Sequence, residues 1–404
     1  MKIVEERAQK VCRGLEASGV YRKIEQIGPA MRVNLASNDY LGVVRRGLLR
    51  PSFTRHAGRM ATGGASSRLI FGTTNAHRAL EEKLAAQFGY EAALVFTSGF
   101  MANYGLCSAL KELADTVLID KRVHASVVDG LMQGMGGKAD VRSFKHNDPS
   151  HYRRLAGHIS GDGCATITES LFSMTGAVCS GEIIDEAARL GFLIVDEAHS
   201  IGACEPSGKL VFGRGHGVDA TIGTFGKAFG SLGGFILCST VLQEFLVNRC
   251  RSFIFTTALP ESYAAVGADA LDLVRGMDEE RAKLANLSSY LSAGLRAEEF
   301  RTSGGAHILA VYCSGAEAAV EVSRLLHERG IAIYAVRPPT VPPGEVLLRV
   351  SLNATLEIDD LDFFIEQLRQ IRKSDHCLFG GATCENTGEA SVRQPRQVRL
   401  QPGS

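Results

Sequence analysis

The feature of this chain that most constrains its fold is a regular alternation of helical and strand-like segments between about residue 76 and residue 240. Helical stretches such as AHRALEEKLAAQFG (76–89) are followed by short apolar segments typical of buried strands. These segments are AALVFT, TVLID, ADVRSF, CATITES, GFLIVDEAH, ATIGTF and GGFILCS. Such alternation predicts an α/β fold with a mostly parallel sheet and helices on both faces. In sheets of this kind, ligands bind beyond the carboxyl ends of the strands.

The remaining sequence suggests how the chain is divided. Residues 1–45 predict an N-terminal segment with a leading helix and a strand that runs into a polar turn in VNLASNDYLG (33–42), and residues 46–260 predict a large domain. Residues 261–373 predict a smaller C-terminal α/β domain that begins with a long, solvated connecting helix. Residues 374–404 are rich in Gly, Gln, Arg and Thr, which predicts a disordered tail.

The composition disfavours several classes of protein. Among 404 residues, 44 Lys and Arg balance 44 Asp and Glu, so no net charge attracts nucleic acid or a membrane surface. The N-terminus is charged and no apolar run of about 18 residues occurs, so neither a secretion signal nor a membrane span is expected. The ten cysteines contain no CxxC pair, which argues against a metal site and favours reduced thiols in a cytoplasmic protein.

The first candidate for chemistry is Asp196, which ends the predicted strand in GFLIVDEAHS (191–200). A buried carboxylate needs a partner, although an aspartate that caps the next turn is the plain alternative. The DEAH motif also occurs in helicases. However, the phosphate-loop pattern GxxxxGK[ST] is absent, because Thr221 replaces its first glycine and Ala228 follows the lysine. A nucleotide-driven motor is therefore disfavoured.

The second candidate is Lys227, within the glycine-rich loop TFGKAFGSLGG (224–234). Glycines let the backbone approach a ligand closely. A surface position is the commonest alternative for a lysine, but this loop is apolar. A partly desolvated lysine has a lowered pKa and can form a Schiff base. The ~30 residues between Asp196 and Lys227 allow one crossover to a neighbouring strand, and an acid with such a lysine is what pyridoxal 5′-phosphate (PLP) requires.

Two further motifs are compatible with a bound phosphate cofactor. In FTSGFMANYG (96–105), Ser98 and Gly99 follow a predicted strand and open a helix, whose backbone N–H groups suit a phosphate. A plain helix cap is the alternative. His124, in VHASVVDG (123–130), is either a histidine satisfied within the core or a residue that lies flat against a cofactor ring.

Nine segments, in order, resemble the α-oxoamine synthases, a family of PLP-dependent enzymes of fold type I. The resemblance covers about residues 33–368 and implies a PLP-dependent acyltransferase that condenses an amino acid with an acyl thioester, with loss of CO₂. The segments are LASNDYLG, TGGASSRLIFGTTNAHRALEEKLA, FTSGFMAN, HASVVDG, FKHND, TESLFSMTG, IVDEAHSIG, TFGKAFGSLGG and FTTALP. The family often has Ser where Phe71 stands in this chain, and the opening segment matches less well.

The resemblance assigns roles to individual residues. It implies that Lys227 holds the cofactor covalently, that Asp196 pairs with its ring nitrogen, and that His124 stacks on the ring. It also implies that His199 contacts the phenolic oxygen. The other residues implied to line the cofactor are Ser98, Gly99, Phe100, Ser173 and Thr224. In a homodimer with shared active sites, the residues implied to reach the partner subunit's phosphate are Thr256 and Thr257.

The same resemblance implies a substrate site. Asn38 and Arg349 would hold the amino-acid carboxylate, and Thr340 would lie close to the acyl substrate. Within the family, VRPPTVPPGEVLLRVSLNA (336–354) is most similar to the branch that condenses L-alanine with a pimeloyl thioester carried by CoA or acyl carrier protein. Either Arg22 or Arg337 would then bind the far carboxylate of the acyl chain. The prolines after Arg337 are expected to stiffen the backbone so that Arg337 and Arg349 face one cavity.

Two alternatives stay open. The chain could use another amino acid and acyl thioester, as 2-amino-3-ketobutyrate CoA ligases, serine palmitoyltransferases and autoinducer synthases do. It could instead be an inert subunit with a PLP-enzyme fold, although the presence of Lys227, Asp196 and His124 favours activity.

Overall fold

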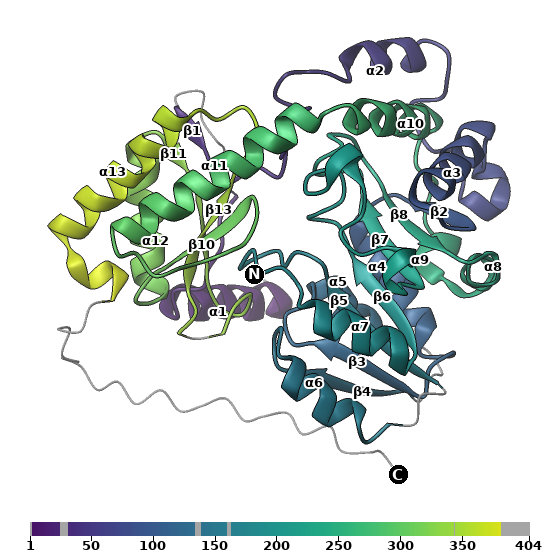
Figure 1. The fold of residues 1–404 in the computed structure, drawn as a ribbon, viewed down its shortest axis with the longest axis horizontal. Coiled ribbons are helices and arrows are strands. Elements are labelled where there is room, and N and C mark those ends of the chain that lie inside the picture. The colour runs from purple at the N-terminus through teal and green to yellow at the C-terminus, as the bar shows by residue number, and fades with distance from the viewer. Residues whose placement is uncertain (1, 25–30, 134–138, 160–162, 343, 381–404) are drawn as a thin grey trace.

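The computed structural model describes residues 2–24, 31–133, 139–159, 163–342 and 344–380. Its main feature is a seven-stranded sheet with the order β2-β8-β7-β6-β5-β3-β4 (Figure 1). Strand β8 is antiparallel to its neighbours and the other pairs are parallel. All seven predicted strands are confirmed, as β2 Ala92–Phe96, β3 Thr116–Asp120, β4 Asp140–Phe144, β5 Cys164–Glu169, β6 Phe192–Asp196, β7 Ala220–Thr224 and β8 Gly234–Cys238.

Helices cover both faces of this sheet, as the alternation predicts. Side chains alternate between the faces along each strand, so Ile194 and Ile222 pack on one side while Leu193 and Val195 pack on the other. The first face is covered by α4 Gly99–Leu110, α5 Ala125–Gln133, α8 Thr240–Arg249 and α9 Arg251–Ile254. The opposite face is covered by α3 Asn75–Phe88, α6 Pro149–Ala156, α7 Gly181–Leu190 and α10 Glu261–Arg275.

A smaller antiparallel sheet lies at the left of Figure 1, with the order β12-β13-β10-β9. Its strands are β9 Thr302–Ser303, β10 Ile308–Tyr312, β12 Tyr334–Val336 and β13 Leu347–Ser351, and its helices include α12 Ala316–Glu328 and α13 Ile358–Ser374. The segment IAIYAVR forms two strands, β11 Ile331–Ala332 and β12, where one was predicted. Strand β11 pairs with β1 Val33–Asn34, which attaches the N-terminal segment to this smaller unit.

The connecting segment differs from its prediction. It forms two helices, α10 and α11 Asp278–Ala297, separated at Gly276 and Met277. Helix α11 is not solvated all round, because one face is buried against the core. The residues of that face recur every three or four positions: Leu284, Leu287, Leu291 and Leu295.

The start of the predicted tail differs from its prediction. Residues 376–379 form a short 3₁₀ helix, and the ring of Phe379 lies 5.1 Å from that of Phe300. The carbonyl of Leu378 accepts a hydrogen bond from the backbone N–H of Ser314. The prediction of disorder is therefore wrong for these residues, while 381–404 lie outside the described part of the chain.

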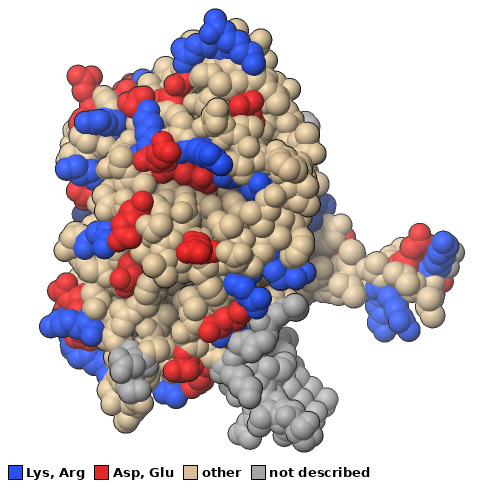
Figure 2. Space-filling model, turned by 90° about the vertical axis from the view of Figure 1, so that its right-hand side faces the viewer, with Lys and Arg blue, Asp and Glu red and all other residues tan. Residues whose placement is uncertain are grey.

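The remaining elements are α1 Ile3–Ala17, α2 Arg50–Ala57 and short helical turns at 68–72, 206–208 and 214–216. The predicted leading helix is confirmed as α1, which buries none of its side chains. On the face seen in Figure 2, basic and acidic side chains are interspersed. Within the described residues, no helix is both long enough and apolar enough to span a bilayer.

Candidate active site

The carboxyl ends of β5, β6 and β7 bring Glu169, Asp196 and Thr224 to one edge of the sheet. Asp196 is 5% exposed, and both of its oxygens accept hydrogen bonds. The side-chain amide of Asn103 on α4 donates to Oδ2 at 2.7 Å, and the backbone N–H of Ala198 donates to Oδ1 at 2.9 Å. These donors fix the orientation of the Asp196 carboxyl group at the end of β6.

Lys227 lies in the loop that follows β7 and lines a cavity of 420 Å³. The cavity is shared with Asn38, Asp39, Arg45 and Asn353. Burial lowers the pKa of Lys227 to about 8, against the opposing effects of Asp196 and Glu169. This agrees with the desolvated lysine expected from its apolar loop, and a lysine of lowered pKa is available as a nucleophile and base near neutral pH.

A chain of hydrogen bonds joins the predicted carboxylate site to His199. Arg349 is 7% exposed, and its guanidinium donates to Oδ1 of Asn38 at 3.2 Å and to the carbonyl of Ser173 at 2.5 Å. The Tyr40 hydroxyl lies 3.2 Å from the same Asn38 oxygen and 2.6 Å from Nδ1 of His199. Burial lowers the pKa of His199 well below its usual value, so this imidazole is neutral. The structure therefore brings Asn38, Arg349 and His199 together through Tyr40.

The start of α4 offers a phosphate site. Ser98 is the N-cap, and its hydroxyl accepts from the backbone N–H of Met101 at 3.2 Å. Among the described hydrogen bonds, the N–H groups of Gly99 and Phe100 have no acceptor. A Cβ on Gly99 would lie 3.2 Å from Thr224, and one on Gly234 would lie 2.5 Å from the Gly99 nitrogen. This close packing of backbone and free N–H groups fits an anionic ligand.

His124 and Ser173 border the same region. Nδ1 of His124 lies 2.6 Å from the Ser126 hydroxyl. Burial lowers the pKa of His124, with Asp196 opposing and Lys227 reinforcing the effect. The backbone N–H of Ser173 donates to Oε2 of Glu169 at 3.2 Å. A neutral imidazole of this kind can lie against a cofactor ring without adding a second cation near Lys227.

The donor set fits PLP on structural grounds. Two buried polar atoms near Asp196, Oε1 of Glu169 and Oδ1 of Asn103, have no hydrogen-bond partner among the described residues. Unsatisfied buried polar atoms are rare in folded proteins, so these two mark a polar interior beside Asp196. Lys227, Asp196 and the free N–H groups of α4 match a cofactor that has an aldehyde, a ring nitrogen and a phosphate.

Thr256 and Thr257 do not line the cavity that contains Lys227. Thr257 is exposed, Thr256 is half-buried, and both lie beside Arg68 and Thr97 in a shallow hollow. Their predicted role at a partner's phosphate therefore stays a prediction.

The N-terminal segment meets the loop that follows β12. Nη2 of Arg22 donates to the Thr340 hydroxyl at 3.0 Å, so the structure brings these two predicted substrate residues together. Arg337 differs from its prediction, because its guanidinium donates to the carbonyls of Gly19 at 2.9 Å and Tyr21 at 2.5 Å. It lines a separate hollow of 460 Å³ and does not share a cavity with Lys227. The expectation that Arg337 and Arg349 face one cavity is wrong, because the guanidinium of Arg337 is already hydrogen-bonded to two backbone carbonyls.

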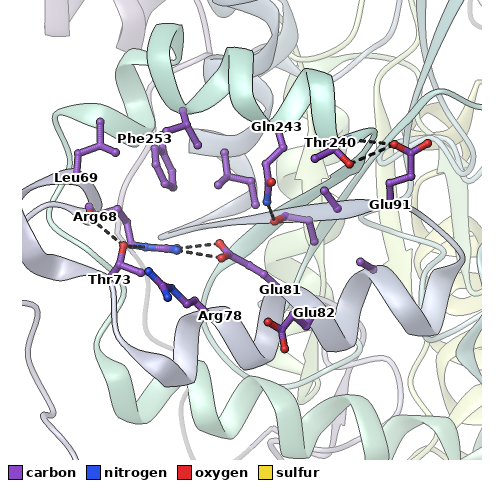
Figure 3. Close-up of a pocket in the computed structure, with 15 residues that line it drawn as sticks. Arg68, Leu69, Thr73, Arg78, Glu81, Glu82, Glu91, Thr240, Gln243 and Phe253 are labelled. Carbon is purple, nitrogen blue, oxygen red and sulfur yellow. Dashed lines mark hydrogen bonds and ion pairs between the residues drawn. The ribbon is translucent and has the colours of Figure 1, made fainter.

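A groove of 440 Å³ along the edge strand β2 lies apart from this chemistry (Figure 3). Glu81 accepts the Val95 N–H at 2.9 Å, and Gln243 donates to the Ala93 carbonyl at 2.8 Å. Arg68 pairs with both oxygens of Glu81 at 3.0 Å. These side chains satisfy the outer backbone groups of an edge strand, and none of the residues predicted to bind cofactor or substrate lines the groove.

Sequence reasoning missed three residues of the site: Asn103, Tyr40 and Glu169. Two of them carried a signal. Asn103 is a polar residue in the otherwise apolar stretch GFMANYGLCSAL. Glu169 ends a strand in the same way as Asp196 does. Tyr40 lies within LASNDYLG, and its aromatic ring gave no indication that its hydroxyl would join two other segments of the chain.

Comparisons with known proteins agree with this geometry. The profile of the family described as aminotransferase class I and II matches residues 30–368. An 8-amino-7-oxononanoate synthase from Citrifermentans bemidjiense is 35% identical over 376 residues, which cover 91% of this chain and 94% of that protein. The 8-amino-7-oxononanoate synthase from Geobacter sulfurreducens is 35% identical over 378 residues, or 89% of this chain and 96% of that protein.

Solved structures show the same fold. Serine palmitoyltransferase from Sphingomonas wittichii is 26% identical, with a TM-score of 0.83 over 94% of this chain and 100% of that chain. Serine palmitoyltransferase from S. paucimobilis, solved with a bound PLP–myriocin aldimine, is 26% identical, with a TM-score of 0.82 over 93% and 99%. This chain therefore belongs to the class I and II aminotransferase family of fold-type I PLP enzymes, and within it to the group of the 8-amino-7-oxononanoate synthases.

Proposed function

We propose that this protein condenses L-alanine with a pimeloyl thioester, with loss of CO₂, to form 8-amino-7-oxononanoate, a step of biotin biosynthesis. The observation that carries the proposal is one site that combines a lysine of lowered pKa, a strand-end aspartate and a carboxylate clamp. The names of the relatives support the choice of substrates and product.

When bound, PLP supplies an electron sink for the electron pair released at the substrate Cα. Asp196, whose carboxyl group is oriented by hydrogen bonds from Asn103 and Ala198, would pair with the ring nitrogen. Lys227 would hold the cofactor, and its amine would accept the proton from the substrate Cα as a base and return a proton as a general acid. A pKa of about 8 suits both tasks near neutral pH.

Arg349 and Asn38 orient the amino acid. Two of the Arg349 contacts go to Ser173 and Asn38, which fix the plane of the guanidinium beside the cavity. A substrate carboxylate held in that plane would fix the orientation of the bonds at Cα for proton removal. His199 is neutral and is held by Tyr40, so it is ready to contact the phenolic oxygen from a fixed position.

Arg22 and Thr340 support the acyl half of the proposal. Their hydrogen bond places two polar side chains between the N-terminal segment and the loop after β12. A guanidinium there can bind the far carboxylate of a pimeloyl chain, which an uncharged acyl group of equal length lacks. Arg337 takes a supporting role, because it fastens the backbone of the segment that carries Arg22.

We also propose a homodimer with shared active sites. Ser67 and Thr257 form an isolated antiparallel bridge, which ties the 66–72 segment to the loop that carries Thr256. Large apolar side chains on these two segments are exposed, at 67%, 99% and 68% for Ile70, Phe71 and Phe255. A second copy that covers this patch would bury those side chains and bring Thr256 and Thr257 to its phosphate site.

The donor of the acyl group is CoA or acyl carrier protein under this proposal, and the location is cytoplasmic, where buried free thiols such as Cys107 and Cys238 stay reduced. The test is an assay of the PLP-loaded protein with L-alanine, glycine and L-serine against pimeloyl, octanoyl and palmitoyl thioesters. We expect turnover to be highest with L-alanine and a pimeloyl thioester. The serine palmitoyltransferase fold of the structural relatives makes L-serine with palmitoyl-CoA the second candidate, and preference for that pair would replace the proposal.

A further inference from the structure

The loop between β12 and β13, residues 337–345, carries Thr340 but is itself held by few buried contacts. Among its described residues only Val341 is buried, at 3% exposed, and Thr340 is exposed. Two backbone hydrogen bonds between its described residues each span only three residues. A loop with so little buried surface depends on contacts with the rest of the chain for a fixed position.

These contacts come from three separate parts of the chain. At the start of the loop, two side chains bind the backbone and a side chain of the N-terminal segment. In its middle, Val341 belongs to an apolar cluster against which Met174 of the large domain packs. At its end, Glu345 forms an ion pair with Arg122 of the large domain. The side chains of Arg122 and Glu345 are 20% and 35% exposed, so water screens their attraction only in part.

The turn that carries Arg122 is fixed at the end of β3. Asp120, the last residue of that strand, is fully buried. Its Oδ1 accepts the N–H of Arg122 and its Oδ2 accepts the N–H of Asn147, each at 2.8 Å. His124, the predicted partner of the cofactor ring, follows Arg122 by two residues. The ion pair therefore joins the turn that presents His124 to the loop that presents Thr340.

The amino-acid side of the site is held without this ion pair. Strand β13, which carries Arg349, is hydrogen-bonded to β10 on one edge and to β12 on the other. The Arg349 guanidinium also donates to Ser173 and Asn38. Loss of the ion pair should therefore release the loop and leave Arg349 in place.

We propose that Arg122 and Glu345 are positioning residues, and that their ion pair holds the 337–345 loop so that Thr340 keeps its place relative to His124. Neither Arg122 nor Glu345 lines the cavity that contains Lys227, so their effect passes through the loop. The catalytic part of this inference rests on the proposed function, since an acyl substrate gives the position of Thr340 its purpose.

The first test measures amide hydrogen exchange of the 337–345 segment in the cofactor-free full chain. We expect about fivefold faster exchange in Arg122→Met than in the wild type, the size of effect that a partly screened ion pair gives. The reversed pair, Arg122→Glu/Glu345→Arg, should restore exchange to within about twofold of the wild type. Equal exchange in the wild type and Arg122→Met would overturn the proposal. This test uses no substrate, so its result is separate from that of the proposed reaction.

The second test separates the two substrates in steady-state kinetics of the PLP-loaded protein, with the acyl thioester that gives the highest turnover. Arg122→Met should raise KM for the thioester about fivefold, while KM for the amino acid stays within about twofold. Arg122→Met/Glu345→Gln should be no worse than Arg122→Met, because either change alone breaks the pair, and the reversed pair should restore KM. An equal rise in both KM values, or additive losses in the double variant, would refute the positioning role.

The ion pair between Arg249 and Glu112 provides a matched control. It lies within the large domain, with Nη2 and Oε2 2.7 Å apart and side chains that are 53% and 27% exposed. Glu112→Gln removes the charge of one partner and contacts no part of the 337–345 loop. It should leave both KM values and the exchange of that loop unchanged, and a rise in KM for the thioester equal to that of Arg122→Met would overturn the proposal.

Discussion

Removal of the Tyr40 hydroxyl tests whether the hydrogen-bond chain across the site matters for catalysis. Tyr40 is fully buried, and its hydroxyl lies 2.6 Å from His199 and 3.2 Å from Asn38. Burial raises the pKa of Tyr40 to about 12, so the hydroxyl keeps its proton at any working pH. Whichever tautomer His199 adopts, the Tyr40→Phe variant leaves one of its ring nitrogens without a partner. The aromatic contact with His307, at 4.0 Å between ring centroids, remains.

The expected size of the effect follows from those two contacts. An unsatisfied buried polar group costs about 1–3 kcal/mol, and 2 kcal/mol corresponds to about 30-fold in rate. We expect kcat/KM for L-alanine to fall about 30-fold in Tyr40→Phe, with much of the loss in KM because Asn38 is no longer fixed. Steady-state kinetics at saturating acyl thioester measures this change.

Tyr152 offers a matched control. It is equally buried, and its hydroxyl lies 2.9 Å from Thr166, in the core between β5 and helix α6. Tyr152→Phe should lower the free energy of unfolding by about 1–3 kcal/mol, as Tyr40→Phe should, but it should leave kcat/KM unchanged. If the two variants showed the same kcat/KM, the Tyr40 hydroxyl would have no role beyond stability.

Four other outcomes are expected. Lys227→Ala should abolish turnover and the visible absorbance of the covalently bound cofactor, and turnover near the parent rate would remove the assignment. Asp196→Asn should keep the fold but slow exchange of the alanine Cα proton with solvent deuterium at least tenfold; unchanged exchange would contradict the electron-sink role. Arg22→Met should reduce the preference for pimeloyl over octanoyl thioester at least tenfold, whereas an unchanged preference would separate Arg22 from the acyl carboxylate. Mixing Lys227→Ala chains with Thr256→Ala/Thr257→Ala chains should restore some activity, and a fully active monomer would exclude shared sites.

The sequence predicted the large sheet well because its signals are local. A buried strand shows apolar residues within its own segment, as AALVF in β2 and FLIVD in β6 do, whereas DVRSF in β4, at the edge of the sheet, has only two. Asp196 and Lys227 could be found in the same way, since each follows such a strand. The smaller unit was predicted less accurately. Strand β9 has only two residues, and the split between β11 and β12 arises because β11 pairs with the distant β1.

Residues whose roles depend on distant partners were the ones that sequence reasoning misplaced or missed. Arg337 stands beside prolines and near Arg349, and that neighbourhood suggested a shared cavity. Its actual partners are backbone carbonyls at Gly19 and Tyr21, and backbone carbonyls carry no sequence signature. Glu169 could have been found, because a strand of known direction places its last side chain on the same face as that of its neighbour. Strand ends that carry acids in register therefore predict that two carboxyl groups lie side by side at the carboxyl edge of the sheet, as Glu169 and Asp196 do.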